Sequence, residues 1–249
     1  MSMLASPAGL KADYGIDAPE LCRLFLLGGG TGVVTGSIIW RLSDDLQGVW
    51  QIIAPMVFWP GLSFLLTGLA MVWGSKVGKL RLRDRILDQL HLTGDEQALD
   101  VGCGRGLMLL GLARRLSTGR GVGIDLWQAQ DQSGNAITAT EENARREGVA
   151  EKVELHTGDM RELPFENKRF DIVVSSWAIH NIPDVAGRVQ AIQQIDRVLK
   201  PGGQLVIVDI SYIGEYQKEL HRLGWTDLKR VGPTFHFVIP SYQLWGRKP

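Results

Sequence analysis

Two long hydrophobic stretches near the N-terminus dominate the pattern of apolar and polar positions. Leu21–Trp40 contains a single charged residue, Arg23, and Val49–Trp73 contains none. At about 1.5 Å per residue, a helix formed by either stretch is long enough to cross the ~30 Å hydrocarbon layer of a bilayer. The pattern predicts a transmembrane hairpin at residues 21–75. Two soluble helices that cap a substrate pocket are the alternative.

Glycines and tryptophans in these stretches fit the packing of helices in a membrane. Gly28, Gly32 and Gly36 recur at every fourth position, which predicts a smooth stripe where the second helix approaches closely. Indole rings favour the membrane interface, and tryptophans stand near the ends of the stretches, at positions 40, 50 and 73.

Charges that flank the stretches predict an orientation. Basic residues crowd the exit of the second stretch, at Lys76, Lys79, Arg81, Arg83 and Arg85. In the link between the stretches, Arg41 is offset by Asp44 and Asp45. Because basic flanking residues stay on the cytoplasmic side of a membrane, we expect the domain that follows to lie on the cytoplasmic face.

Beyond residue 76 the pattern changes to short apolar runs that end in polar or acidic residues. They recur at the intervals that a doubly wound α/β sheet requires. These runs are Ala98–Val101, Gly121–Asp125, Val153–Met160, Phe170–Ser176 and Gly203–Asp209. A helix at Glu215–Leu223 and two closing strands, around Trp225–Val231 and Ser241–Trp245, bring the predicted sheet to seven strands.

Three alternating glycines, Gly102, Gly104 and Gly106, follow the first run. Glycines permit positive φ and carry no Cβ, so a ligand can approach the backbone closely at the start of the next helix. The spacing G-x-G-x-G differs from the G-x-G-x-x-G of dinucleotide-binding turns. Asp100, at the strand end, suits a cationic group rather than a phosphate. The turn therefore predicts a nucleotide-type ligand with a positive charge.

Two further acids end the next runs. Asp125 lies about twenty residues beyond the glycine turn, where a carboxylate can accept hydrogen bonds from both ribose hydroxyls. Asp159 is followed by Met160. This pair can accept a hydrogen bond from an exocyclic amine and pack on a purine face. Packing in the core is the alternative for Met160.

Composition excludes several other classes of protein. The formal net charge is zero and the pI is about 7.0, which argues against a nucleic-acid enzyme with a basic face. The two cysteines, Cys22 and Cys103, suggest neither a disulfide framework nor a metal cluster. We therefore expect no metal, and we expect Cys103 to be a small residue of the turn rather than a nucleophile.

From about residue 76 to residue 249, the chain resembles the class I S-adenosylmethionine-dependent methyltransferases, in the branch that includes the ubiquinone/menaquinone and sterol methyltransferases. Four ordered motifs carry the resemblance: Leu99–Gly106, Asp125, Gly158–Met160 with Leu163-Pro164-Phe165 after it, and Leu199–Gly203. The resemblance implies a Rossmann-like doubly wound sheet, S-adenosylmethionine as cofactor and S-adenosylhomocysteine as product. The N-terminal hairpin departs from that branch, which puts quinone specificity in doubt.

The resemblance also implies which residues bind the cofactor. Asp100 and the glycine turn would hold the methionine part, and Asp125 the ribose. Asp159 would bind the adenine amine, and Ser176 would lie beside the sulfonium. The full set is Asp100, Gly102, Cys103, Gly104, Gly106, Asp125, Leu126, Trp127, Gly158, Asp159, Met160, Ser175 and Ser176.

Two residues are candidates for a role beyond cofactor binding. His180 follows the fourth strand in a loop that faces the methyl group in the resembling enzymes, so it is a candidate general base. A histidine that only shapes the pocket is the alternative. Tyr14, in the segment before the hairpin, is a candidate lid residue, and a solvated juxtamembrane segment is its alternative.

These observations predict three parts: an N-terminal segment at residues 1–20, the hairpin at residues 21–75 and a methyltransferase domain at residues 76–249. We expect methyl transfer to an apolar or membrane-associated small molecule, such as a quinone precursor, a lipid or a hydrophobic thiol. A soluble methyltransferase with an apolar cap is one alternative. A membrane protein that binds S-adenosylmethionine without turnover is another, and a Rossmann oxidoreductase is remote.

Overall fold

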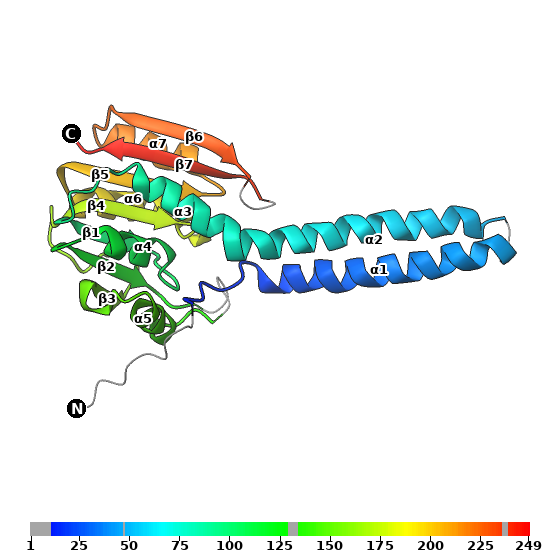
Figure 1. Ribbon diagram of the computed structural model, residues 1–249. Helices are drawn as coiled ribbons and strands as arrows, with labels where there is room; N and C mark the ends of the chain where they lie inside the picture. Colours follow the sequence, from blue (N-terminus) through cyan, green and yellow to red (C-terminus); the bar gives the residue numbers. More distant parts are fainter. Residues whose placement is uncertain (1–10, 47, 129–133, 236–238) are drawn as a thin grey trace, which may run out of the picture.

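The computed structural model describes residues 11–46, 48–128, 134–235 and 239–249. Two long antiparallel helices, α1 (Pro19–Leu46) and α2 (Trp50–Trp73), project from an α/β domain (Figure 1). A single π-helical turn, Gly74–Gly78, connects α2 to α3 (Lys79–Asp88), which packs on the domain. The predicted hairpin therefore exists as a pair of helices, and its second helix leads directly into the domain.

The domain is a seven-stranded sheet with the order β3-β2-β1-β4-β5-β7-β6. Its first five strands are parallel and β7 is antiparallel to both neighbours. The strands are β1 (Gln97–Val101), β2 (Arg120–Asp125), β3 (Val153–Thr157), β4 (Phe170–Ser176), β5 (Leu199–Asp209), β6 (Leu228–Thr234) and β7 (Ser241–Arg247). This arrangement confirms the predicted doubly wound class.

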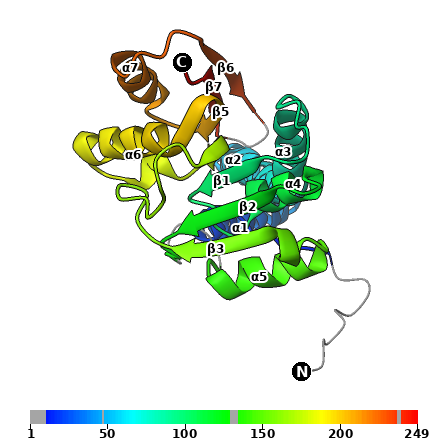
Figure 2. The same cartoon turned by 90° about the vertical axis from the view of Figure 1, so that its left-hand side faces the viewer.

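Helices cover both faces of the sheet, as Figure 2 shows in an end-on view. They are α4 (Leu107–Arg115), α5 (Ile137–Arg146), α6 (Val185–Val198) and α7 (Ile213–Arg222). The central strands are apolar and buried on both faces, so the core lies between β1, β4 and β5 and these helices. The strand order reverses between β1 and β4, which places the ligand crevice of a doubly wound sheet at their carboxyl ends.

The hairpin helices keep most of their large apolar side chains on the outside. Only 17% of the most apolar window of each helix is buried, whereas a core helix of a soluble protein is mostly buried. By length and composition, both helices are sufficient to cross a bilayer. Burial within the domain therefore does not explain the apolar character of this hairpin.

Small residues let the two helices approach closely, as predicted for Gly32 and Gly36 but not for Gly28. A Cβ built on Gly29 would lie 2.3 Å from the backbone nitrogen of Leu65, and one on Gly32 would lie 2.8 Å from Cα of Gly61. A Cβ on Gly28 meets nothing within 4 Å, so the prediction for Gly28 is wrong. The buried small positions are spaced by seven residues, at Gly29 and Gly36 on α1 and at Ala54, Gly61 and Gly68 on α2. This repeat follows the heptad geometry of antiparallel helices at a small crossing angle rather than a four-residue stripe.

Candidate active site

The glycine turn links β1 to α4 at the point where the strand order reverses. Its three glycines have φ of +74°, +49° and +85°, at Gly102, Gly104 and Gly106. A Cβ on Gly102 would lie 2.2 Å from Cβ of Ala178 in the loop after β4. Both the backbone conformation and the contact therefore require glycine at this position, as the sequence predicted.

Asp100, at the end of β1, is a buried carboxyl with one free oxygen. Its Oδ2 accepts a hydrogen bond from the backbone N–H of Leu109 in α4, at 2.8 Å. Its Oδ1 is buried and has no hydrogen-bond partner among the described residues. Burial raises the pKa of Asp100 to about 7, and the charge of Asp125 adds to the effect. A cationic group beside Oδ1 would satisfy the oxygen and favour the carboxylate.

Asp125 ends β2 and braces the glycine turn. Its Oδ2 accepts from the backbone N–H of Gly104 at 2.8 Å, and its Oδ1 accepts from that of Trp127 at 2.6 Å. Oδ1 also accepts from Nδ2 of Asn135 at 3.3 Å. The carboxylate thus lies next to the turn, where the sequence predicts a ligand for ribose.

Asp159, after β3, is engaged by a side chain that the sequence analysis did not single out. Arg161 holds both carboxylate oxygens, with Nη2 2.6 Å from Oδ2. This hydrogen-bonded ion pair lowers the pKa of Asp159. Any amine that binds Asp159 must therefore share the carboxylate with the guanidinium of Arg161.

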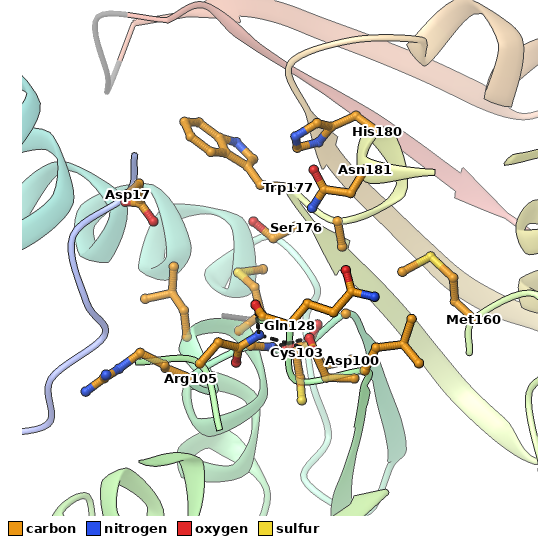
Figure 3. Close-up of a pocket in the computed structure, with 18 of the residues that line it drawn as sticks. Asp17, Asp100, Cys103, Arg105, Gln128, Met160, Ser176, Trp177, His180 and Asn181 are labelled. Atoms are coloured by element: carbon orange, nitrogen blue, oxygen red, sulfur yellow. Dashed lines mark hydrogen bonds between the residues drawn. The ribbon is translucent and has the colours of Figure 1, made fainter. Parts of the chain in front are cut away.

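These groups open into one cavity of about 560 Å³ at the carboxyl edge of the sheet (Figure 3). It gathers most of the predicted site: Asp100, Gly102, Cys103, Gly104, Asp125, Leu126, Gly158, Asp159, Met160, Ser176 and His180. The residues come from four different strand ends and were predicted separately. Their convergence supports the predicted ligand edge.

Three predicted cofactor residues do not line the cavity, and each has a structural position instead. Gly106 caps α4, and a Cβ there would meet Cγ2 of Thr140 at 2.9 Å. Trp127 donates from Nε1 to the hydroxyl of Thr157 at 2.8 Å. Ser175 is buried and donates from Oγ to the carbonyl of Val101 at 2.8 Å, which ties β4 to β1.

Tyr14, the candidate lid residue, does not line this cavity either. Its ring is buried in a cluster with residues of α4 and α5, and its hydroxyl donates to Glu147 at 2.8 Å. Burial and the Glu147 carboxylate raise the pKa of the phenol, so the hydroxyl stays protonated. The buried ring and its bonded hydroxyl anchor this segment to α4 and α5.

The segment that contains Tyr14, residues 11–18, forms an N-terminal strap across the domain. The ammonium of Lys79 donates to the carbonyls of Tyr14 and Gly15 at 2.7 and 3.0 Å and lies 3.1 Å from Asp17. Arg105, in the glycine turn, donates to the carbonyl of Asp13 at 2.7 Å. The strap thus joins the foot of the hairpin to the glycine turn.

Sequence reasoning missed several residues that line the cavity. They are Asp17 and Ala18 of the strap, Lys79, Leu82, Arg83 and Ile86 of α3, and Gln128, Asn135, Arg161, Asn181 and Ile239. Trp177 has φ of +54°, a conformation that is uncommon for a large side chain. The loop after β4 and the segment before the hairpin are candidate parts of the site by sequence, but nothing local in the sequence places α3 beside them. The sequence also offers His221 and His236 as possible pocket residues. His236 lies outside the described residues, and His221 bonds to the carbonyl of Trp225.

Comparison with known proteins identifies the part of the chain that contains the cavity as similar to methyltransferases. Residues 99–207 match the family model described as a methyltransferase domain. This part of the chain matches a methyltransferase domain and has the fold of the class I S-adenosylmethionine-dependent methyltransferases. The predicted fold class and S-adenosylmethionine as the cofactor are thereby confirmed.

The relatives match over about half of this chain, and the solved structures match over about 70% of it. Demethylmenaquinone methyltransferase of Lactiplantibacillus plantarum is 33% identical over 130 residues, or 52% of this chain and 51% of that protein. A SAM-dependent methyltransferase of Aquifex aeolicus matches with a TM-score of 0.56 and 18% identity, over 70% of this chain and 94% of that one. Geranyl diphosphate C-methyltransferase of Streptomyces coelicolor matches with a TM-score of 0.55 and 16% identity, over 68% and 76%. The chain spans about half the length of the curated relatives it matches.

The residues of the cavity fit S-adenosylmethionine. The unpartnered Oδ1 of Asp100 is an acceptor for an ammonium group, and the space at Gly102 is one that a Cβ would fill. Asp125 and Asp159 add two acceptors at neighbouring strand ends. The groups available to a ligand are carboxylates and backbone amides, which suit a cationic nucleoside.

Proposed function

We propose that the protein is a membrane-anchored enzyme that transfers a methyl group from S-adenosylmethionine to an apolar or membrane-associated small molecule. The observation that carries the proposal is the composition of the cavity wall. One side consists of the strand ends and the glycine turn. The other consists of Asp17 and Ala18 of the strap, immediately before α1, and of Lys79 and Leu82 in α3. The cofactor edge of the sheet and the foot of the apolar hairpin therefore share one cavity.

The side chains on the acceptor side favour an apolar molecule. Leu82 and Ile86 of α3, Met108 of α4, Trp177 and Ile239 line the cavity. Burying apolar surface against such side chains stabilises a bound molecule by about 25 cal/mol per Å². The names of the similar proteins support this class of acceptor, since they refer to demethylmenaquinone and to geranyl diphosphate. The acceptor would reach the cavity along the membrane surface.

Within this proposal, the cofactor residues keep the roles that the sequence predicted. Asp100 accepts from the ammonium of the methionine part, and Asp125 accepts from the ribose hydroxyls. Asp159 accepts from the adenine amine beside Met160, and Ser176 lies near the sulfonium. When bound, S-adenosylmethionine supplies an already activated methyl group, so the protein has mainly to position the acceptor in line with it.

The membrane part of the proposal rests on the hairpin and on the charges at its foot. Exposed apolar side chains along α1 and α2 would face lipid, and the basic residues that follow α2 would remain on the cytoplasmic side. The parts at residues 1–20, 21–75 and 76–249 then correspond to a strap-bearing segment, a membrane anchor and a catalytic domain.

The test is calorimetric titration of the detergent-purified protein with S-adenosylmethionine and then with S-adenosylhomocysteine. We expect micromolar binding of both. Asp125→Ala should weaken binding by roughly 1.5–3 kcal/mol, the range for hydrogen bonds that involve a charged group. The matched control is Asp171→Ala, at the opposite end of β4, which should not change binding. Folded protein that binds neither compound would refute the cofactor assignment.

Two further measurements separate the proposal from its alternatives. Protein released into the supernatant without detergent would identify a soluble enzyme whose apolar helices cap the pocket. Tritiated S-adenosylmethionine incubated with a lipid extract should yield a labelled product. Tight cofactor binding with no labelled product from any lipid fraction would identify a binding protein without turnover.

A further inference from the structure

A fully buried carboxylate lies behind the cavity and is absent from the lining. Asp209 ends β5 and is 0% exposed. Its Oδ1 accepts from the backbone N–H of Ile210 at 2.8 Å, and its Oδ2 accepts from the hydroxyl of Tyr216 in α7 and from the backbone N–H of His180, both at 3.2 Å. A buried carboxylate is costly unless hydrogen bonds compensate it, and the fold provides three fixed donors at this position.

Asp209 contacts the side chain of His180, and His180 lines the cavity. Nδ1 of the imidazole lies 2.6 Å from Oδ1 of Asp209, which is within hydrogen-bonding distance, although the contact does not meet the full geometric definition of a hydrogen bond. The imidazole is about 20% exposed and lines the cavity with Trp177 and Asn181 (Figure 3). Because an ionised carboxylate only accepts, Asp209 favours the tautomer with the proton on Nδ1. Nε2 is then left as an acceptor.

The other partner of Asp209 reinforces this tautomer. Burial and the Asp209 carboxylate raise the pKa of Tyr216, so its hydroxyl remains a donor. Behind Tyr216, Arg188 and Glu215 form an ion pair at 2.8 Å. The remaining charged groups that line the cavity are Asp17, Lys79, Arg83, Asp100, Arg105, Asp125, Asp159 and Arg161. His180 and Asp209 therefore form a dyad, and the imidazole of His180 faces the acceptor side of the cavity.

We propose that His180 is the general base of methyl transfer, with Asp209 and Tyr216 as positioning residues, and that the acceptor atom carries a proton when it binds. This inference rests on the proposed function. The acceptor gives its phenolic or enolic proton to Nε2 of His180. Its oxygen, or a ring carbon conjugated with that oxygen, forms a bond to the methyl carbon, while the S–CH₃ bond breaks and leaves a neutral thioether. When the methyl group adds to a ring carbon, the hydrogen of that carbon moves to the oxygen as the ring becomes aromatic again. The positive charge of the sulfonium ends on the imidazolium, so charge and protons balance.

The proposal selects a class of acceptor. A phenol, or a ring carbon made nucleophilic by loss of a phenolic proton, needs a base at neutral pH because its pKa is about 10. A tertiary amine or a thioether has no proton to lose and would gain nothing from the dyad. We therefore assign a phenolic or enolic acceptor with an apolar tail.

The first test is nitrogen-15 spectroscopy of the histidine rings in the protein loaded with S-adenosylhomocysteine. The chain has five histidines, so His180→Asn assigns the signals of interest. We expect the tautomer with the proton on Nδ1, and we expect Asp209→Asn to abolish that preference. A ring protonated on Nε2, or one whose tautomer is unchanged in Asp209→Asn, would overturn the positioning role.

The second test uses tritiated S-adenosylmethionine and two probes in nanodiscs: demethylmenaquinol with a short prenyl chain and a thioether with the same chain. We expect transfer to the quinol and none to the thioether. His180→Asn should lower kcat by about 10²–10⁴-fold without changing cofactor affinity, and the fall in kcat on acidification should disappear. Asp209→Asn should lower kcat less than His180→Asn does, with KM unchanged, and Tyr216→Phe should have a smaller effect.

The control is His91→Asn, an exposed position with φ of +49° that asparagine tolerates, and it should retain full activity. Undiminished turnover by His180→Asn across the pH range would overturn the inference. So would transfer to the thioether, or cofactor binding with transfer to neither probe, although the cofactor assignment would survive. Loss of cofactor binding in the parent protein would instead refute the proposed function itself.

Discussion

Binding of S-adenosylmethionine should depend on pH through Asp100. Burial raises the pKa of this carboxyl from 3.8 to about 7, which corresponds to about 4 kcal/mol of free energy that opposes its ionisation in the empty site. An ammonium group beside Oδ1 would favour the ionised form. Binding should therefore release a proton below pH 7, and Kd should rise by up to about tenfold for each pH unit below that value.

The assay is calorimetry from pH 5.5 to 8 in two buffers with different ionisation enthalpies, which gives the number of protons released. Asp100→Asn should remove the proton release and weaken binding by roughly 1.5–3 kcal/mol, or about 10- to 150-fold. The matched control is Asp171→Asn, whose carboxylate contacts Lys200 and the start of β1, outside the cavity. It should behave like the parent.

The pH dependence of folding stability provides an independent test of the raised pKa of Asp100. Because the pKa of Asp100 is higher in the folded protein than in the unfolded chain, its contribution favours folding most at low pH and is lost as pH rises from about 4 to 7. Asp100→Asn should therefore raise the Tm at pH 8, by an amount that corresponds to at most about 4 kcal/mol. Constant Kd across the pH range, together with an unchanged or lower Tm in Asp100→Asn, would refute the reasoning.

Two other predictions concern the hairpin and the strap. Gly29→Leu should separate α1 from α2, because a Cβ there would lie 2.3 Å from the backbone of Leu65. The thermal stability of the hairpin in detergent, followed by circular dichroism, should fall. Gly28→Leu is the matched control and should have little effect. Lys79→Met should speed hydrogen exchange in the strap, since it leaves two carbonyls without their donor at about 1–3 kcal/mol each. Lys76→Met, which removes a half-exposed ion pair, should change exchange much less, and equal effects of the two variants would contradict the role of Lys79.

The strand ends were the most predictable part of this protein. Each parallel strand is a short apolar run, and each ends where a polar residue must meet solvent or a ligand. β4 spans Phe170–Ser176, as predicted. The closing strands were placed less well, because Trp225 belongs to the core and donates to Asp196, so β6 begins only at Leu228. Local patterns therefore predicted the elements, and tertiary packing determined their ends.

Contacts between distant segments could not be predicted from local patterns. The spacing of Gly28, Gly32 and Gly36 indicated a close approach of helices, but the crossing angle that selects Gly29 depends on both helices together. The strap is fixed by Lys79 and by Asn143, which exchanges two hydrogen bonds with the backbone of Asp13. Asp209, in contrast, could have been predicted as a site residue, because it is an acid at the end of the fifth strand, just as Asp125 is at the end of the second.

The position of the strap bears on how the membrane and the chemistry are connected. The strap begins beside the glycine turn, through the contact of Arg105 with Asp13, and it ends where α1 begins. Lys79 holds its middle from α3, which continues from α2 through the π-helical turn. Residues next to the foot of the hairpin therefore line the cavity, and in the proposed function the membrane surface would lie on the acceptor side. An acceptor with an apolar tail can then present its reactive end to His180 while its tail remains along the hairpin. An acceptor that is wholly soluble would gain nothing from this arrangement.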